Sequence, residues 1–240
     1  MKNAPERRTK RLRGKNMNMK QTEELRKKQS NEPERLLRRK AKRRKTGKRI
    51  MAIGLILVLC ALCLVGYNIW DSARAGGESD AILADLDDGI PDEGPVIEPD
   101  EMPTIMIDGY AYIGELSIPG LDIRLPVMAD WDYTRLKISP CRYSGSYLNN
   151  DLVICAHNYS RHFSPIKWIG VGESVYFIAV NGRVYEYTVT NRETLQPTDV
   201  ELLVSNQNNT EDAVEEWDLS LFTCNTGGRT RCVVRCSRVN

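Results

Sequence analysis

A cysteine, a glycine-containing turn and several arginines lie close together at the end of the 240-residue sequence, in the stretch SLFTCNTGGRTRCVVRCSRVN. The NTGG segment holds the residue types that tolerate positive φ and close hairpins. Alternating apolar residues on both sides predict two antiparallel strands. With residues 225–230 as the loop, Cys224 lies opposite Arg231, and directly opposed Cβ atoms are about 4.5–5.5 Å apart. The hairpin therefore predicts a thiol beside a permanent cation.

The same register divides the hairpin between two faces, because successive side chains of a strand point to opposite sides. Cys224 and Arg231 share the more polar face. The other face is expected to point into the core, and its residues are Leu219, Leu221, Thr223, Cys232, Val234 and Cys236. A slip of one residue would exchange the two faces.

The histidine that could serve this thiol is His157, which ends the strand pattern DLVICAH; the only other histidine is His162. A free thiol has a pKa near 8.5, so a nucleophilic cysteine needs a neighbouring cation that favours the thiolate. A cysteine nucleophile, a histidine acid/base and an arginine facing the developing oxyanion form a complete set for acyl transfer. Cys224, His157 and Arg231 are therefore the candidate catalytic residues. Cys155 is a rival thiol, because it shares pleat parity with His157.

The elements that must position these residues follow a segment able to cross a membrane. Residues 1–49 carry 21 Lys and Arg against 5 Asp and Glu, whereas residues 50–240 carry 13 against 27. Between the two blocks, the uncharged run 50–70 is long enough to span about 30 Å of hydrocarbon as a helix. The positive-inside rule then predicts a single-pass protein with a cytoplasmic N-terminus and an extracellular domain. A cleaved signal peptide is the alternative, although its apolar core usually has about 7–15 residues.

The segments flanking this anchor are polar. Residues 1–49 are predicted to be a largely disordered cytoplasmic tail that sets the topology, with a clamp on anionic lipid as the alternative. Nucleic-acid binding is not expected, since the tail is tethered to a membrane and has no aromatic residue for stacking. Residues 71–108 are rich in Asp, Glu, Gly and Pro, which predicts an extended, mobile linker. The folded domain is expected to occupy residues 109–240.

Short strand patterns separated by turn signals recur through this domain, which favours a mainly β fold, a barrel or a sandwich. Short helices are expected near 131–137, 163–169 and 198–204. Outside the apolar run there are five cysteines, and an odd number in an exported domain suggests a free reactive thiol. None of these five cysteines forms a CxxC pair, and histidine is scarce, so neither a metal site nor a cofactor is expected.

Three motifs of the domain resemble those of the sortase family. SLFTC is similar to the T-L-x-T-C signature, ICAH to the T-x-G-H segment, and RCVVR to the arginine-bearing strand. Ser220 and Ala156 depart from the pattern without removing a reactive group. The stretches YIGELSIPGLDIRLPV and FSPIKWIGVGESVYFIAVNGRVYEYTV also resemble sortase segments, so the likeness covers residues 109–240.

This resemblance implies a closed eight-stranded β-barrel with short helices, preceded by one transmembrane helix. It implies that Cys224 is the nucleophile, His157 the general acid/base and Arg231 the cation that stabilises the oxyanion or orients the substrate. Of the neighbouring arginines, Arg229 lies in the turn and Arg235 lies about 13 Å further along the strand.

The reaction implied by the resemblance is a two-step transpeptidation. The substrate would be a surface protein bearing a C-terminal, LPXTG-like sorting signal, cleaved between Thr and Gly. The acceptor would be an amine of a peptidoglycan precursor or of a pilin lysine. Two other classes stay open: a different exported Cys/His acyl-transfer enzyme or peptidase, and a non-catalytic anchored β-domain in which Cys224 forms half of a disulfide.

Overall fold

The computed structural model describes residues 19–92, 94, 100–205 and 217–239. The chain divides into two compact units, Met1–Leu64 and Val65–Asn240. The second unit begins within helix α1 (Met19–Gly89). Its other elements, in chain order, are β1 (Ile105–Ile107), β2 (Tyr110–Ile118), η1 (Pro119–Leu121), β3 (Ile123–Met128), η2 (Arg135–Lys137), β4 (Cys141–Ser144), β5 (Leu152–Cys155), η3 (Ser164–Trp168), β6 (Ser174–Ala179), β7 (Val184–Leu195), α2 (Val200–Val204), β8 (Leu219–Cys224) and β9 (Arg231–Arg238).

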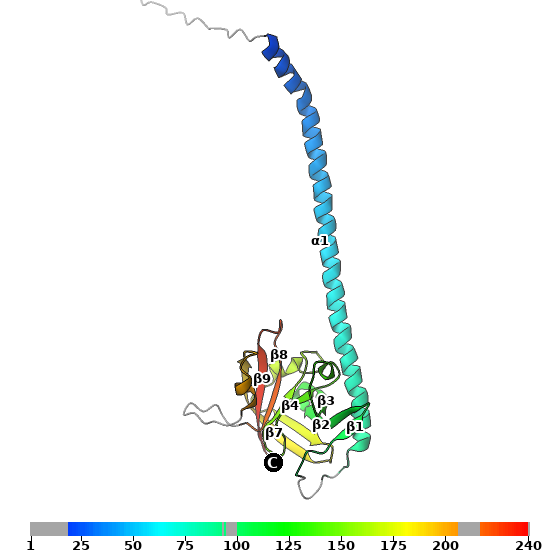
Figure 1. Cartoon of the computed structure of the whole chain (residues 1–240), viewed down its shortest axis with the longest axis vertical. Coiled ribbons are helices and arrows are strands. Elements are labelled where there is room, and N and C mark those ends of the chain that lie inside the picture. The colour runs from blue at the N-terminus through cyan, green and yellow to red at the C-terminus, as the bar shows by residue number, and fades with distance from the viewer. Residues whose placement is uncertain (1–18, 93, 95–99, 206–216, 240) are drawn as a thin grey trace, which may run out of the picture. The chain divides into compact units, whose positions relative to one another are not determined.

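The strands form one sheet that closes on itself (Figure 1). Their order is β1-β2-β3-β4-β5-β8-β9-β7-β6, and β6 also pairs with β2. Strands β2 to β9 therefore make a closed eight-stranded barrel, as predicted, and β1 is an addition to β2. Closure removes the unpaired edges that a flat sheet would expose. The expected short helices are present as η2, η3 and α2. Strands β1 and β4, of three and four residues, are not among the strand patterns expected from the sequence.

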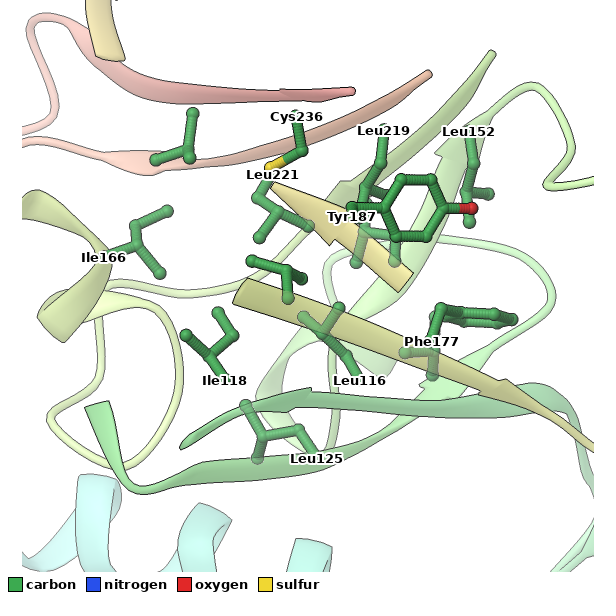
Figure 2. Close-up of a cluster of buried hydrophobic side chains, with 14 of the residues drawn as sticks. Leu116, Ile118, Leu125, Leu152, Ile166, Phe177, Tyr187, Leu219, Leu221 and Cys236 are labelled. Carbon is green, nitrogen blue, oxygen red and sulfur yellow. The ribbon is translucent and has the colours of Figure 1, made fainter. Parts of the chain in front are cut away.

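The barrel interior is apolar because alternate side chains of every strand point inward. In β6, for example, Val175, Phe177 and Ala179 are buried while the residues between them are partly exposed. Figure 2 shows side chains from several strands meeting in this interior, with Leu116, Phe177 and Leu221 among them.

The hairpin of β8 and β9 has the predicted register. Cys224 pairs with Arg231 and Ser220 pairs with Arg235. The loop is closed by backbone hydrogen bonds from Asn225 N to Thr230 O, 2.9 Å, and from Gly228 N to Asn225 O, 2.8 Å. Gly228 has φ 71°, a left-handed conformation that favours glycine. The face predicted to be core lies inside the barrel or is buried.

The opposite face of the hairpin is less polar than expected. Phe222 and Val233 belong to a second buried cluster on the outside of the barrel. Leu86 of α1, Leu203 of α2 and Trp217 contribute to this cluster. The barrel wall is therefore buried on both faces here, because helices and a loop cover it.

The prediction that residues 71–108 form an extended linker is wrong for residues 71–89, which continue α1. Ala75, Ile82 and Leu86 are buried at helical spacing, and the last two join the outer cluster. At Gly76 the helix approaches the barrel so closely that a Cβ would lie 2.4 Å from Cδ of Arg161. The domain boundary expected at Gly109 thus falls inside the unit Val65–Asn240. The physical reason is a narrow stripe of small and apolar residues that gains burial only when helical.

Residues 19–49, predicted to be largely disordered, are also helical and exposed along their whole length. Their Glu, Lys, Arg, Gln and Leu residues have high helix propensity, and Glu34 and Arg38 form an i,i+4 ion pair of 2.8 Å. Residues 1–18 of the tail lie outside the described residues.

By length and composition, α1 is the one helix in the described part of the chain that could cross a membrane, and its apolar side chains from Ile50 to Trp70 are exposed.

Truncating Leu86 should test whether the end of α1 belongs to the folded unit. Leu86 is fully buried, so Leu86→Ala should lower the free energy of unfolding by about 2–4 kcal/mol. Urea denaturation of a soluble fragment comprising residues 65–240 measures this loss. Asp85→Ala, at the exposed neighbouring position, should change stability by less than about 0.5 kcal/mol. Equal stability of the two variants would mean that the helix does not pack on the barrel.

Candidate active site

The structure brings the ends of β5 and β8 together as parallel neighbours. Cys155 pairs with Phe222, and beyond that pair Ala156 N donates a hydrogen bond to Phe222 O, 3.2 Å. Thr223 Oγ1 donates to Ala156 O at 2.8 Å. His157 and Cys224 each follow the last pair of these strands by two residues, so they lie at the same end of the barrel. Neighbouring strands lie about 4.8 Å apart, and residues two apart share a face.

Arg231 reaches the same end of the barrel from β9, where it pairs with Cys224. Its Nη1 donates hydrogen bonds to Gly228 O, 3.1 Å, and to Thr230 O, 3.4 Å. The guanidinium is therefore held by the carbonyls of its own turn, and Cys224 and Arg231 are both half-buried. The three residues selected from the sequence thus gather at the ends of three consecutive strands of the sheet.

The other two arginines have different surroundings. Arg229 is exposed in the turn. Arg235 is only 3% exposed and forms an ion pair with Glu193, 2.8 Å, while its Nη1 donates to Ser220 Oγ at 2.9 Å. Burial lowers the pKa of Arg235, and Glu193 opposes this effect. Arg235 stacks on Trp217 with its guanidinium carbon 4.8 Å from the ring centroid, so it joins β9 to its neighbours and lies away from the thiol.

Cys224 is the most accessible thiol of the barrel. All seven cysteines of the chain are free. Cys141 is buried on β4 directly opposite Cys155. Burial raises the pKa of Cys141 to about 12 and that of Cys155 well above its usual value. The rival thiol is therefore held in its protonated, unreactive form. Burial also raises the pKa of Cys232 and Cys236.

His157 lies in a half-buried position just beyond the end of β5. Burial lowers its pKa; the negative charge of Asp71 opposes this change, and Lys137 adds to it. The ring of Tyr159 packs with its centroid 5.0 Å from that of the imidazole. Burial and Lys137 favour the neutral imidazole, whereas the carboxylate of Asp71 favours the protonated form.

His162 has a different environment. It is fully buried, and its Nε2 lies 3.2 Å from Ser79 Oγ of α1. Burial lowers its pKa to about 4. His162 is thus a neutral residue at the contact between the helix and the barrel.

Sequence reasoning missed Asp71, because residues 71–108 have the composition of a linker, and it missed Tyr159, because that side chain's role depends on its contact with Asp71. The signal for a packed helix was present as the spacing of Ser72, Ala75 and Ser79, which are all buried, followed by the apolar residues of the outer cluster. No group of three or more His, Cys, Asp or Glu side chains in the described segments could hold a metal ion.

Comparison with known families supplies the identification. A model described as the sortase domain matches residues 116–239. The chain belongs to the sortase family. The barrel is accordingly a sortase domain, and the enzyme is a cysteine transpeptidase.

Solved sortase structures resemble this one. Sortase C1 from Streptococcus agalactiae is 28% identical, with 56% of this chain and 71% of that chain covered and a TM-score of 0.45. Sortase C-3 from Streptococcus pneumoniae is 24% identical, with coverage of 72% and 84% and a TM-score of 0.46. Sortase A from Listeria monocytogenes is 23% identical, with coverage of 54% and 88% and a TM-score of 0.43. No curated protein matches the sequence.

Acid should destabilise this sortase domain through His162. The pKa of an unfolded histidine is about 6.5, whereas that of His162 in the folded protein is about 4. Between these values the unfolded state binds a proton that the folded state does not, so stability falls as the pH falls. The loss attributable to His162 should reach about 2 kcal/mol between pH 7 and pH 5. Urea denaturation of wild type and His162→Gln at both pH values isolates this contribution, and an identical pH dependence of the two proteins would contradict it.

Proposed function

We propose that the chain is a membrane-anchored sortase whose catalytic residues are Cys224, His157 and Arg231. The observation that supports this proposal is the parallel pairing of β5 with β8, whose last pair, Cys155 and Phe222, lies two residues before His157 and Cys224, together with the pairing of Cys224 with Arg231 across the hairpin. Its substrate is the C-terminal, LPXTG-like sorting signal of a surface protein.

In the first step, the thiolate of Cys224 attacks the carbonyl carbon of the threonine in the Thr–Gly bond. The oxygen of the tetrahedral intermediate gains negative charge, and Arg231 stabilises it electrostatically. Protonated His157 donates its proton to the leaving glycine amine. The C–N bond breaks, and a thioester joins the surface protein to Cys224.

In the second step, an amine attacks the thioester, and neutral His157 accepts the proton that the amine loses. The thiolate of Cys224 leaves, so the enzyme returns to its starting charge state. The amine belongs to a peptidoglycan precursor or to a pilin lysine. Both steps need the imidazole to alternate between its protonated and neutral forms, which an ordinary histidine does near neutral pH.

The apolar run 50–70 serves as the anchor in this proposal. The 21 basic residues among the 49 that precede it favour a cytoplasmic N-terminus. The catalytic domain then lies outside the cell, where sorting signals and peptidoglycan precursors are available.

The test is to incubate the purified protein with a panel of sorting-signal peptides and amine acceptors and to identify the products by mass. Cleavage between Thr and Gly, a thioester on the enzyme and an amide to the added amine are expected. Cleavage at another bond, or hydrolysis that no amine diverts, would favour a peptidase of different specificity.

A further inference from the structure

The loop that carries His157 is bound by helix α1. This loop, residues 156–163, connects β5 to η3, and four consecutive residues in it contact the helix. The contacts are Tyr159 OH to Asp71 Oδ2, 2.6 Å; Ser160 N to Ser72 Oγ, 3.0 Å; Arg161 Nη2 to Asp80 Oδ2, 2.7 Å; and His162 Nε2 to Ser79 Oγ, 3.2 Å. The loop is also compact within itself, because Phe163 N donates to His157 O at 3.3 Å and His162 N donates to Tyr159 O at 3.1 Å. The backbone of His157 is therefore fixed to a segment that the helix holds in place.

Among these contacts, the one made by Tyr159 leads directly to the imidazole. The Tyr159 ring lies against the His157 ring, with centroids 5.0 Å apart and planes at 43°. Its hydroxyl donates the short hydrogen bond to Asp71. Asp71 is in turn held by Arg74, one helical turn along α1, at 3.1 Å. The side chains of Arg74, Asp71 and Tyr159 thus contact one another in turn, and the last of them contacts the imidazole of His157.

We propose that Asp71 and Tyr159 are positioning residues for His157: the carboxylate on α1 holds the tyrosine ring against the imidazole and favours its protonated form. This inference rests on the proposed catalytic role of His157. The reaction requires that imidazole to donate a proton to the leaving amine, and burial alone works against the charged form.

The charges around His157 support this assignment. Asp71 from α1 raises its pKa, while Lys137 from η2 and burial lower it. His162, in the same loop, is neutral at physiological pH because burial lowers its pKa to about 4. From the barrel side, Cys224 ends β8 and Arg231 begins β9.

Asp71 stays ionised throughout the useful pH range, since the hydrogen bond from Tyr159 lowers its pKa. Arg74 adds to this lowering, whereas burial and the hydrogen bond to Asp71 raise the pKa of Tyr159 to about 12, so the phenol keeps the proton that it donates. Asp71 is therefore the negative charge that offsets burial at His157, and its removal should lower the imidazole pKa.

The test compares Asp71→Asn and Tyr159→Phe with wild type in the full-length protein, in detergent. Asp71→Asn keeps the shape of the side chain and removes its charge, while Tyr159→Phe keeps the ring and removes the hydroxyl. The control is Asp85→Asn, which removes one negative charge from an exposed position of the same helix, about 21 Å further along its axis.

Two readouts separate positioning from a purely structural role. The first is the NMR titration of His157, which His162→Gln identifies because the sequence has only two histidines. The second is the pH profile of kcat for transpeptidation. With Asp71→Asn the pKa of His157 should fall, and the limb on which activity is lost with rising pH should move to lower pH. At neutral pH, kcat should fall about tenfold with little change in KM, a part of the 10²–10⁴-fold effect of general acid–base catalysis.

Tyr159→Phe should shift the titration in the same direction by a smaller amount, and Asp85→Asn should shift neither readout. An unchanged His157 titration in folded Asp71→Asn would overturn the inference, whatever the activity. A shifted titration in a protein that processes no sorting peptide would support the coupling of Asp71 to His157 and would contradict the proposed function instead. A shift of equal size in Asp85→Asn would also overturn the inference, because it would reduce the effect to net charge.

Discussion

Cys224→Ala should abolish both cleavage of sorting peptides and transfer to an amine while the protein stays folded. Cys224 is half-buried at the very end of β8, so alanine leaves no large cavity and breaks no strand pairing. The other four thiols of the barrel are buried, and burial raises the pKa of each. Intact-mass detection of the thioester, together with circular dichroism, measures the loss of chemistry separately from the loss of structure.

The matched controls are single alanine replacements of these buried cysteines. Each should retain the thioester adduct, since alanine suits an apolar environment and none of the four is placed to react. Cys155→Ala is the most informative control, because Cys155 is the last residue of β5 and precedes His157 by only two residues. An adduct that survives Cys224→Ala, or that disappears in a folded Cys155→Ala protein, would assign the nucleophile elsewhere.

Arg231→Ala should reduce kcat by about 100-fold or more, the usual cost of removing one oxyanion-stabilising group. The β8–β9 register sets this side chain opposite Cys224, and the carbonyls of Gly228 and Thr230 hold its guanidinium. Arg231→Lys should restore little activity, because an ammonium group lacks the planar fork of donors that a guanidinium offers. Steady-state kinetics with a single peptide and amine measure both variants.

Two further arginine variants serve as comparisons. Arg229→Ala, in the exposed turn, should lower kcat less than threefold. Arg235→Ala should act on stability instead, since it leaves Glu193 and Ser220 without the partner that binds them. A kcat loss in Arg229→Ala as large as that in Arg231→Ala, in folded proteins, would show that the cation facing the oxyanion has been misassigned.

The fold could be predicted wherever local pattern determines it. The hairpin register could be predicted because the NTGG turn fixes where the chain reverses and therefore which residues face one another across it. The C-terminal part of α1 was not readable in the same way. The segment from Asp71 to Gly89 has the acidic, glycine-containing composition of a linker, and only its contacts with the barrel turn the spacing of Ala75, Ile82 and Leu86 into burial.

In the candidate site, too, local sequence patterns predict some residues, and long-range contacts determine the others. The pairing of Cys224 with Arg231 is local and follows from the hairpin. The position of His157 depends on a parallel pairing between strands 67 residues apart, which no local pattern specifies, so its inclusion came from the chemistry of a thiol and from family motifs. Asp71 depends on a tertiary contact of a helix that the sequence did not predict, and it was therefore missed.

The place of the β8–β9 hairpin in the strand order has a consequence for folding. It lies between β5 and β7, although both of those strands precede it in the sequence. Until it inserts, both of those strands have an unpaired edge, which is a template for aggregation. Long-range pairing of this kind is also slow, because the entropy of closing the intervening loop opposes it. The step that ends this vulnerable period also brings the end of β8, which carries Cys224, next to the end of β5, which precedes His157, so an incompletely folded molecule lacks the proposed active site.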